Sequence, residues 1–159
     1  MSGEVLGIDV GGSSVKGGLV DVARGAVRGT LISAPTPRPC TPASLMPVLV
    51  ALAGRLDGRT GRAGVAFPSV IKHGTAYTAA NIDASWIGTN GEALAAQALG
   101  RPVLMLNDAD AAGIAEMRFG SGVGAEMSVP LTAPRATSTS PPLTEDPPTS
   151  MPSTSPLMP

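Results

Sequence analysis

The sequence predicts an α/β fold with a mixed sheet over residues 1–129, followed by a disordered C-terminal tail over residues 130–159. Two apolar runs near the N-terminus flank a glycine turn, which is typical of an antiparallel hairpin. The continuous apolar run Val103–Leu106 lies between two helical segments, which is typical of a strand in a parallel sheet. From Pro130 onward, proline, serine and threonine dominate and apolar periodicity is lost, so burial cannot offset the cost of ordering the chain.

Charge and composition restrict the classes of function. The formal net charge is −1 and aromatic residues make up 3% of the chain. Because the chain has no basic block and few aromatic side chains for base stacking, we expect neither nucleic acid nor an anionic membrane as a partner. Cys40 is the single cysteine, which excludes an intrachain disulfide and a cysteine-built zinc cluster. With no leader pattern and no apolar run of about 20 residues, the prediction is a soluble, cytoplasmic protein.

The N-terminal segment predicts an antiparallel meander. Val5–Ile8 and Val15–Val20 are the first two strands, and Ala26–Ile32 is the third, after a turn over Val22–Gly25. Prolines at 35, 37 and 39 then predict an extended connection.

A helix is predicted to follow, with Thr41 as its N-cap and Pro42 at its first position. Pro47 is expected to kink this helix or to delay its start. Apolar residues at helical spacing predict its buried face, namely Leu45, Val48, Leu49, Leu52 and Leu56.

The middle of the chain predicts a buried strand over Ala63–Phe67 and a small hairpin with strands over 69–71 and 75–80. His73 lies in the hairpin turn without a neighbouring ligand, so we expect it to be solvated. Thr89 and Glu92 have the spacing of a capping box for a helix over residues 90–99 that ends at Gly100.

Val103–Leu106 is predicted to be a strand buried on both faces. Asn107 and Asp108 end it, and a helix over Ala109–Arg118 follows. These two polar residues therefore lie at the carboxyl end of a strand, where open α/β sheets place ligands. Asp110 is expected in the first turn of the helix in a structural role, because its charge is favourable there.

The turn after the first strand has the residues of a phosphate site. Its glycines permit backbone conformations that other residues avoid, its hydroxyls donate, and a lysine adds positive charge. Asp9 would repel a bare phosphate, so we expect it to hold a hydrated magnesium ion that bridges the two. The alternative is a tight surface hairpin in which Asp9 and the lysine are solvated. The predicted phosphate-binding residues are Gly11, Gly12, Ser13, Ser14 and Lys16.

Four segments together carry a resemblance to a known family: Gly7–Lys16, Gly64–Pro68, Thr78–Asn90 and Leu106–Gly113. Over residues 4–127 the sequence resembles the amino-terminal lobe of a ROK-family sugar kinase, most closely the polyphosphate glucokinase branch of actinobacteria. The segment Asn81–Gly88 is the most specific to that branch.

The resemblance implies an actin-like, ribonuclease H-like kinase fold with two lobes around a sugar cleft. It implies phosphoryl transfer from polyphosphate or ATP to the 6-hydroxyl of glucose, with Mg²⁺, and a possible homodimer in the intact family. Asp108 would be the catalytic base, Asn107 and Asn81 would bind the sugar, and Asp9 would bind the metal. For Trp86, a role as packing anchor is favoured over sugar stacking, because a single large aromatic is usually buried.

The sequence also departs from the family pattern. Ser14 and Ser69 stand where glycines are usual, and no Gly-Thr-Gly-x-Gly or Gly-His-x-Glu motif follows Val129. The segment Gly120–Gly124 is not a substitute, because it lies at a helix end. The change in composition near Val129 is interpreted as a shifted reading frame or a misjudged gene end, which the other two frames of the DNA would test.

The chain alone is therefore expected to have negligible turnover and to leave an apolar face uncovered. The alternative function is a non-catalytic lobe that binds phosphate or a partner protein. A ROK-type repressor is disfavoured, because the first strand starts within a few residues of Met1 and leaves no room for a helix-turn-helix.

Overall fold

The computed structural model describes residues 3–56 and 61–120. The predicted disordered tail over 130–159 and most of the segment 120–124 lie outside these residues. The elements, in chain order, are β1 (Glu4–Val10), β2 (Ser14–Asp21), β3 (Ala26–Pro35), α1 (Pro42–Arg55), β4 (Ala63–Phe67), β5 (Ile71–Lys72), β6 (Thr75–Ala76), a 3-10 turn (Ala84–Trp86), α2 (Gly91–Leu99), β7 (Val103–Asn107) and α3 (Asp108–Phe119).

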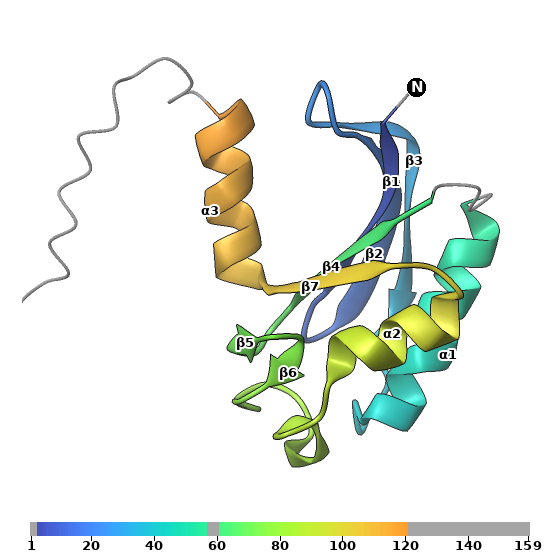
Figure 1. Ribbon diagram of the computed structural model, residues 1–159. Coiled ribbons are helices and arrows are strands. Elements are labelled where there is room, and N and C mark those ends of the chain that lie inside the picture. Colours follow the sequence, from blue (N-terminus) through green and yellow to red (C-terminus); the bar gives the residue numbers. More distant parts are fainter. Residues whose placement is uncertain (1–2, 57–60, 121–159) are drawn as a thin grey trace, which may run out of the picture. The chain divides into compact units, whose positions relative to one another are not determined.

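The main sheet is mixed, with the strand order β3-β2-β1-β4-β7 (Figure 1). β1, β2 and β3 form the predicted antiparallel meander, and β1 pairs with β2 from Glu4 opposite Asp21 to Val10 opposite Val15. β4 lies parallel to β1, and β7 lies parallel to β4. Because parallel strands need long crossovers, α1 and α2 provide the connections that bring β4 and β7 into the sheet. The mixed sheet predicted from the sequence is confirmed.

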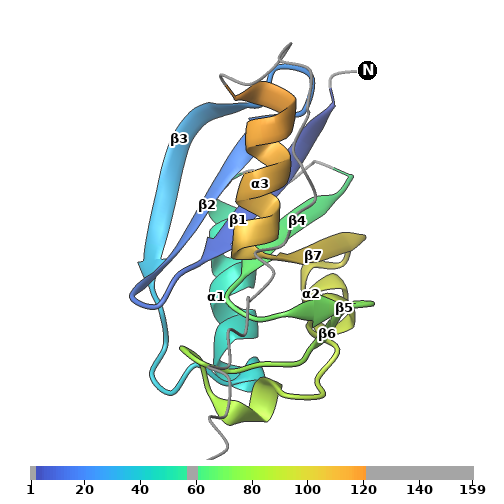
Figure 2. The same cartoon turned by 90° about the vertical axis from the view of Figure 1, so that its left-hand side faces the viewer.

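The sheet lies between helices on both of its faces, with α1 and α2 on one side and α3 on the other (Figures 1 and 2). Alternate residues of the central strands point toward α1 and α2 and are buried, as strand geometry requires. Leu6 and Phe67 have no exposed surface, and neither has Leu49 of α1. This layer is the hydrophobic core, and the site residues extend from its edge.

α1 begins where the sequence predicts, because Thr41 and Ser44 form a reciprocal capping box at its N-terminus. The Ser44 amide donates to Thr41 Oγ1 at 3.1 Å, and the Thr41 amide donates to Ser44 Oγ at 2.9 Å. Pro47 lies inside the helix and does not delay its start, so of the two expected effects only a kink stays a prediction. The cap and the fully buried Leu45 and Leu49 fix the first turns despite the backbone hydrogen bond that proline cannot donate.

The N-terminus of α2 differs from the prediction. The cap is Asn90, whose side chain accepts a hydrogen bond from the Ala93 amide at 2.8 Å, and not Thr89, whose hydroxyl donates to the Ser85 carbonyl. Glu92 does not close a capping box, because its carboxylate accepts the amide of Met105 in β7 at 2.9 Å. The C-terminus is as predicted, since Gly100 ends the helix with a φ of 64°.

The small hairpin forms, but its strands are shorter than predicted. β5 and β6 pair over two residues each, and His73 takes a φ of 50° in the exposed turn between them. After Ala76 the chain turns toward the Asn81 segment. One more backbone hydrogen bond joins the Tyr77 amide to the Val70 carbonyl at 2.9 Å, and side chains continue the pairing beyond it, since Ser69 Oγ donates to the Thr78 carbonyl at 2.7 Å.

β7 was expected to be buried on both faces, and this was wrong. Met105 points into the core, whereas Leu104 is 57% exposed on the opposite face. β7 is an edge strand of the described sheet, and α3 leaves a 370 Å³ cavity between itself and that face (the open-face cavity). Exposed Val27 and Leu31 of β3 also border this cavity. An apolar face is therefore uncovered in the described part of the chain, as expected.

Within residues 3–56 and 61–120, every helix is too short or too polar to cross a lipid bilayer.

Candidate functional site

The carboxyl ends of β1, β4 and β7 meet at one edge of the sheet, because the three strands are parallel. At this edge lies a cleft of 630 Å³, here called the carboxyl-end cleft. Its lining includes several of the predicted site residues, which come from three separate segments of the chain. The lining residues are Asp9, Val10, Gly11, Gly12, Ser13, Arg38, Pro68, Asn81 and Asp108.

The loop 11–13 after β1 is held tightly by its neighbours. The Gly11 amide donates to the Ser14 carbonyl at 3.0 Å, which closes the turn. Thr36, 8% exposed, donates its hydroxyl to the Gly11 carbonyl at 2.7 Å and its amide to the Ser13 carbonyl at 3.1 Å. Among the described residues, the amides of Gly12 and Ser13 meet no acceptor. Successive amides without acceptors on a fixed loop are suited to an anion.

The two glycines of this loop are not needed for the reason expected from the sequence. Neither Gly11 nor Gly12 has a positive φ. A Cβ at Gly11 would lie 2.8 Å from the Ser14 carbonyl oxygen, so glycine is required there for close approach of the backbone. A Cβ at Gly12 would meet no atom within 4 Å, and space around this residue remains open for a ligand.

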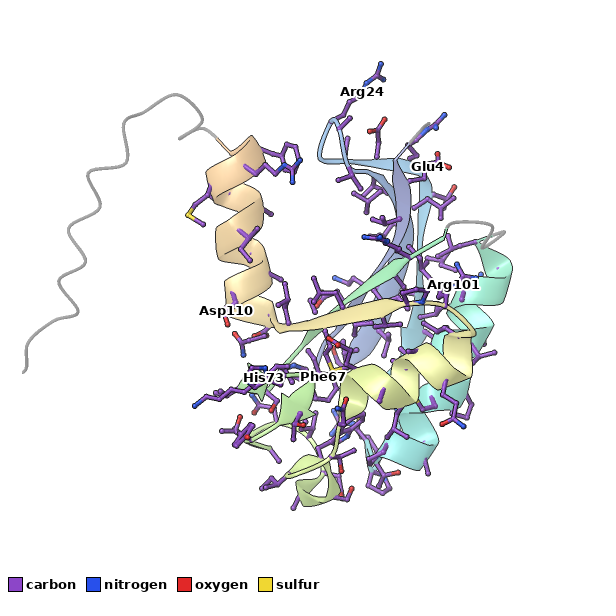
Figure 3. The ribbon with its side chains drawn as sticks, viewed as in Figure 1. Glu4, Arg24, Phe67, His73, Arg101 and Asp110 are labelled. Carbon is purple, nitrogen blue, oxygen red and sulfur yellow. The ribbon has the colours of Figure 1, made fainter. Side chains whose placement is uncertain are left out.

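Asn107 and Asp108 occupy the junction of β7 and α3, as predicted. Asn107 is the N-cap of α3, and its Oδ1 accepts the amides of Ala109 and Asp110 at 2.9 and 3.3 Å. Its Nδ2 donates to the Ser69 carbonyl at 2.8 Å, which ties the end of β7 to the loop after β4. Asp108 is exposed in the cleft, and Asp110 lies in the first turn of α3 (Figure 3).

The segment that carries Asn81 is anchored by Trp86. The Trp86 ring has no exposed surface and lies 4.5 Å from the Phe67 ring, centroid to centroid. Its Nε1 donates to the Cys40 carbonyl at 2.8 Å. The expected role of Trp86 as a packing anchor is confirmed, since a buried ring cannot stack on a sugar. Hydrogen bonds from Ser85 lower the pKa of nearby Asp83 below its usual range.

Three predicted residues lie outside the cleft lining. Lys16 pairs in register with Asp9 on the neighbouring strand, and its side chain borders the open-face cavity. Ser14 is the first residue of β2, and its carbonyl accepts the Gly11 amide. Asn107, the residue before Asp108, is half-buried.

Arg38 was missed by the sequence analysis. Among the described residues, it is the one basic residue in the lining of the carboxyl-end cleft, and its Nη2 donates to the Gly12 carbonyl at 3.3 Å. The feature that could have pointed to Arg38 is its position between Pro37 and Pro39. The sequence was interpreted there only as an extended connection.

The donors at the cleft suit a magnesium ion held partly by substrate. The described residues contain no cluster of three His, Cys, Asp or Glu side chains that could hold a metal by itself. Asp9 and Asp108 offer exposed carboxylates. Mg²⁺ is commonly bound by one or two carboxylates together with phosphate oxygens and water, and the site fits that pattern.

Comparison with known proteins decides the family. The model of the ROK family matches residues 5–134. The chain belongs to the ROK family. The resemblance noted in the sequence is therefore confirmed. Polyphosphate glucokinase of Mycobacterium tuberculosis is 47% identical over 118 residues, which are 74% of this chain and 44% of that protein. The Mycobacterium leprae protein of the same name is 45% identical, and the match covers 36% of it.

Solved ROK structures share the fold. The inorganic polyphosphate/ATP-glucomannokinase of Arthrobacter sp. strain KM matches with a TM-score of 0.73 and 44% identity, over 77% of this chain and 51% of that one. A ROK glucokinase from Streptomyces griseus, solved with glucose and AMPPNP, matches with a TM-score of 0.68 and 28% identity, over 77% of this chain and 38% of that one. The predicted actin-like kinase fold is confirmed. This ROK chain spans about half or less of the length of these relatives.

Proposed function

We propose that this ROK chain carries the amino-terminal half of a glucokinase-type active site, which transfers a phosphoryl group from polyphosphate or ATP to the 6-hydroxyl of glucose. The observation that carries the proposal is the meeting of the loop 11–13, Asp9, Asn81 and Asp108 in one cleft. Relatives named as polyphosphate glucokinases and a glucomannokinase support this donor and sugar class.

Each residue has a separate role in the proposed reaction. The loop from Gly11 to Ser13 binds donor phosphate in the cleft, and Ser14 closes the loop by accepting the Gly11 amide. Lys16 lies outside the cleft lining, so its phosphate role stays a prediction from the sequence. Asp9 holds Mg²⁺, which would neutralise charge on the phosphoryl group. Asn81 and Asn107 bind sugar hydroxyls, and Asn107 has one Nδ2 hydrogen left for this after its bond to Ser69.

Asp108 acts as the base that accepts the proton of the 6-hydroxyl. In phosphoryl transfer the protein mainly positions the reactants and stabilises charge, and an ordinary carboxylate suffices when the proton leaves late. The start of α3 fixes this carboxylate, because the Ala109 amide donates to Asp108 Oδ1 at 2.8 Å and to the Asn107 cap. The exposed position of Asp108 leaves its other oxygen available to substrate.

The decisive experiment is a chimaera. In it, the matching 118-residue segment of the M. tuberculosis polyphosphate glucokinase is replaced by the segment of this chain. We expect glucose 6-phosphate from glucose, Mg²⁺ and polyphosphate or ATP, and we expect Asp108→Asn to lower kcat by about 10²- to 10⁴-fold. Asp110→Asn is the matched control, because Asp110 lies outside the cleft lining, and it should retain activity. A folded chimaera without turnover would contradict the proposal.

The 159-residue chain alone is expected to give no product above background. The homodimer remains a prediction of the family resemblance, to be tested by sedimentation. The cytoplasmic location remains a prediction from the sequence, to be tested by fractionation.

A second candidate function rests on the open-face cavity and the exposed Val27, Leu31 and Leu104 around it. In this case the chain is a non-catalytic lobe that binds a partner protein. An Asp108→Ala change would then leave the cellular effect of the chain intact, whereas a catalytic role requires that the effect be lost.

A further inference from the structure

The charge of the carboxyl-end cleft is not balanced by the residues predicted from the sequence. Two carboxylates, Asp9 and Asp108, line it, and the phosphoryl donor adds further negative charge. Lys16, the predicted cation, lies opposite Asp9 on the neighbouring strand and borders the open-face cavity, which Asp9 also lines, but it does not line the cleft. Arg38 is therefore the protein cation that the cleft itself presents.

Arg38 extends from a backbone segment that is fixed against the loop 11–13. Thr36 makes two hydrogen bonds to this loop, at 2.7 and 3.1 Å. Pro37 and Pro39 restrict the backbone on either side of Arg38, since proline fixes its own φ and limits the residue before it. The base of the arginine side chain is thus held at the edge of the cleft before any ligand arrives.

The guanidinium group itself is only lightly engaged. Among the described residues, its single hydrogen bond is the 3.3 Å contact from Nη2 to the Gly12 carbonyl, and no carboxylate lies within ion-pair distance. Arginine has five N–H donors in a planar fork, which matches the geometry of phosphate oxygens. Four of these donors remain for a ligand in the cleft.

We propose that Arg38 binds a phosphate group of the phosphoryl donor, next to the phosphate held by the Gly12 and Ser13 amides. This inference rests on the proposed function, because it takes the loop 11–13 as part of the donor site. A donor with several linked phosphates, such as polyphosphate or a nucleoside triphosphate, supplies an oxyanion at each of the two positions. Arg38 then determines the affinity for the phosphoryl donor and not the affinity for the sugar.

A purely structural role is the competing explanation. In that case the contact to Gly12 braces the loop, and the positive charge is solvated. The two roles differ in what a change at Arg38 affects, since a brace acts on stability and a ligand residue acts on affinity for anions.

The test measures tripolyphosphate binding to the full 159-residue chain by ¹H–¹⁵N NMR titration at physiological salt. We expect the Gly12 and Ser13 amides to shift on titration. Arg38→Met should weaken binding by about 10- to 100-fold, as expected for loss of a charge-assisted contact, and Arg38→Lys should retain part of the affinity. Arg24→Met is the matched control and should bind normally, because Arg24 lies in the turn between β2 and β3 at the other end of the strands (Figure 3).

The outcomes separate the two proposals. If Gly12 and Ser13 shift in the unsubstituted chain and Arg38→Met binds equally well, the role of Arg38 is wrong and the proposed function stands. If the unsubstituted chain shows no shift at these amides, both the donor role of the loop and the role of Arg38 are wrong. If Arg24→Met weakens tripolyphosphate binding as much as Arg38→Met does, the chain attracts the anion only through its overall charge, and the role of Arg38 is wrong.

Discussion

Trp86→Phe is the change that best tests how the Asn81 segment is held. The substitution removes the Nε1 donor and leaves the Cys40 carbonyl with only the 3.4 Å contact from the Asp83 amide. A buried acceptor that loses its partner costs about 1–2 kcal/mol. The smaller ring also leaves a void beside Phe67, which costs about another 1–2 kcal/mol. We expect the free energy of unfolding to fall by about 2–4 kcal/mol in total.

The assay is urea unfolding of the variant and the unsubstituted chain, followed by far-UV circular dichroism. In thermal unfolding the same loss should lower the Tm by roughly 8–16 °C, at about 4 °C per kcal/mol for a domain of this size. Ile87→Ala is the matched control on the adjacent residue. Ile87 is 58% exposed, so this change should alter stability by no more than about 0.5 kcal/mol.

Two results would refute the reasoning. A loss below about 1 kcal/mol for Trp86→Phe would mean that the indole hydrogen bond and the contact with Phe67 do not hold the segment. A loss for Ile87→Ala equal to that for Trp86→Phe would mean that burial does not distinguish the two positions.

Three further predictions concern other parts of the chain. Gly11→Ala should abolish tripolyphosphate binding in NMR titration, because its Cβ would clash with backbone, whereas Gly12→Ala should leave the loop folded. Glu92→Ala should lower the free energy of unfolding by about 1–3 kcal/mol in urea, because the amide of Met105 loses its acceptor, and Glu92→Gln should restore most of it. Burial, and secondarily the nearby carboxylate of Asp83, raises the pKa of the Cys40 thiol above 9.0. The protonated thiol therefore contributes fully to the free energy of unfolding below pH 9.0, and this contribution is lost as the pH rises through the folded-state pKa. Urea unfolding at pH 8 and pH 10 should show this loss, and Cys40→Ala should reduce it.

Local signals in the sequence were enough to predict most elements. Thr41 before Pro42 marked the start of α1, and Gly100 marked the end of α2, because caps depend on residues close in the chain. The site at Asp108 was also predictable, because a strand followed by a helix places the intervening residue at the edge of a parallel sheet.

The errors arose where a distant contact decided the outcome. Glu92 had the spacing of a capping residue, but the unpaired amide of Met105 in β7 was a competing donor that the local sequence does not show. The apolar run with Leu104 was interpreted as buried on both faces, although only one face of β7 meets the core. Arg38 was missed because its position at the cleft depends on the tertiary contact of Thr36 with Gly11.

The strand order has a consequence for how the molecule folds. β1, β2 and β3 are joined by short turns, so their pairing closes small loops at little entropic cost. Pairing of β1 with β4, and of β4 with β7, must instead bridge dozens of residues that include α1 and α2. Because local pairings form faster than distant ones, we expect the meander to form first and the parallel strands to dock later. We therefore expect Asp9 and the glycine loop to be in place early, and Asp108 to reach them only when β7, the last strand of the sheet, joins.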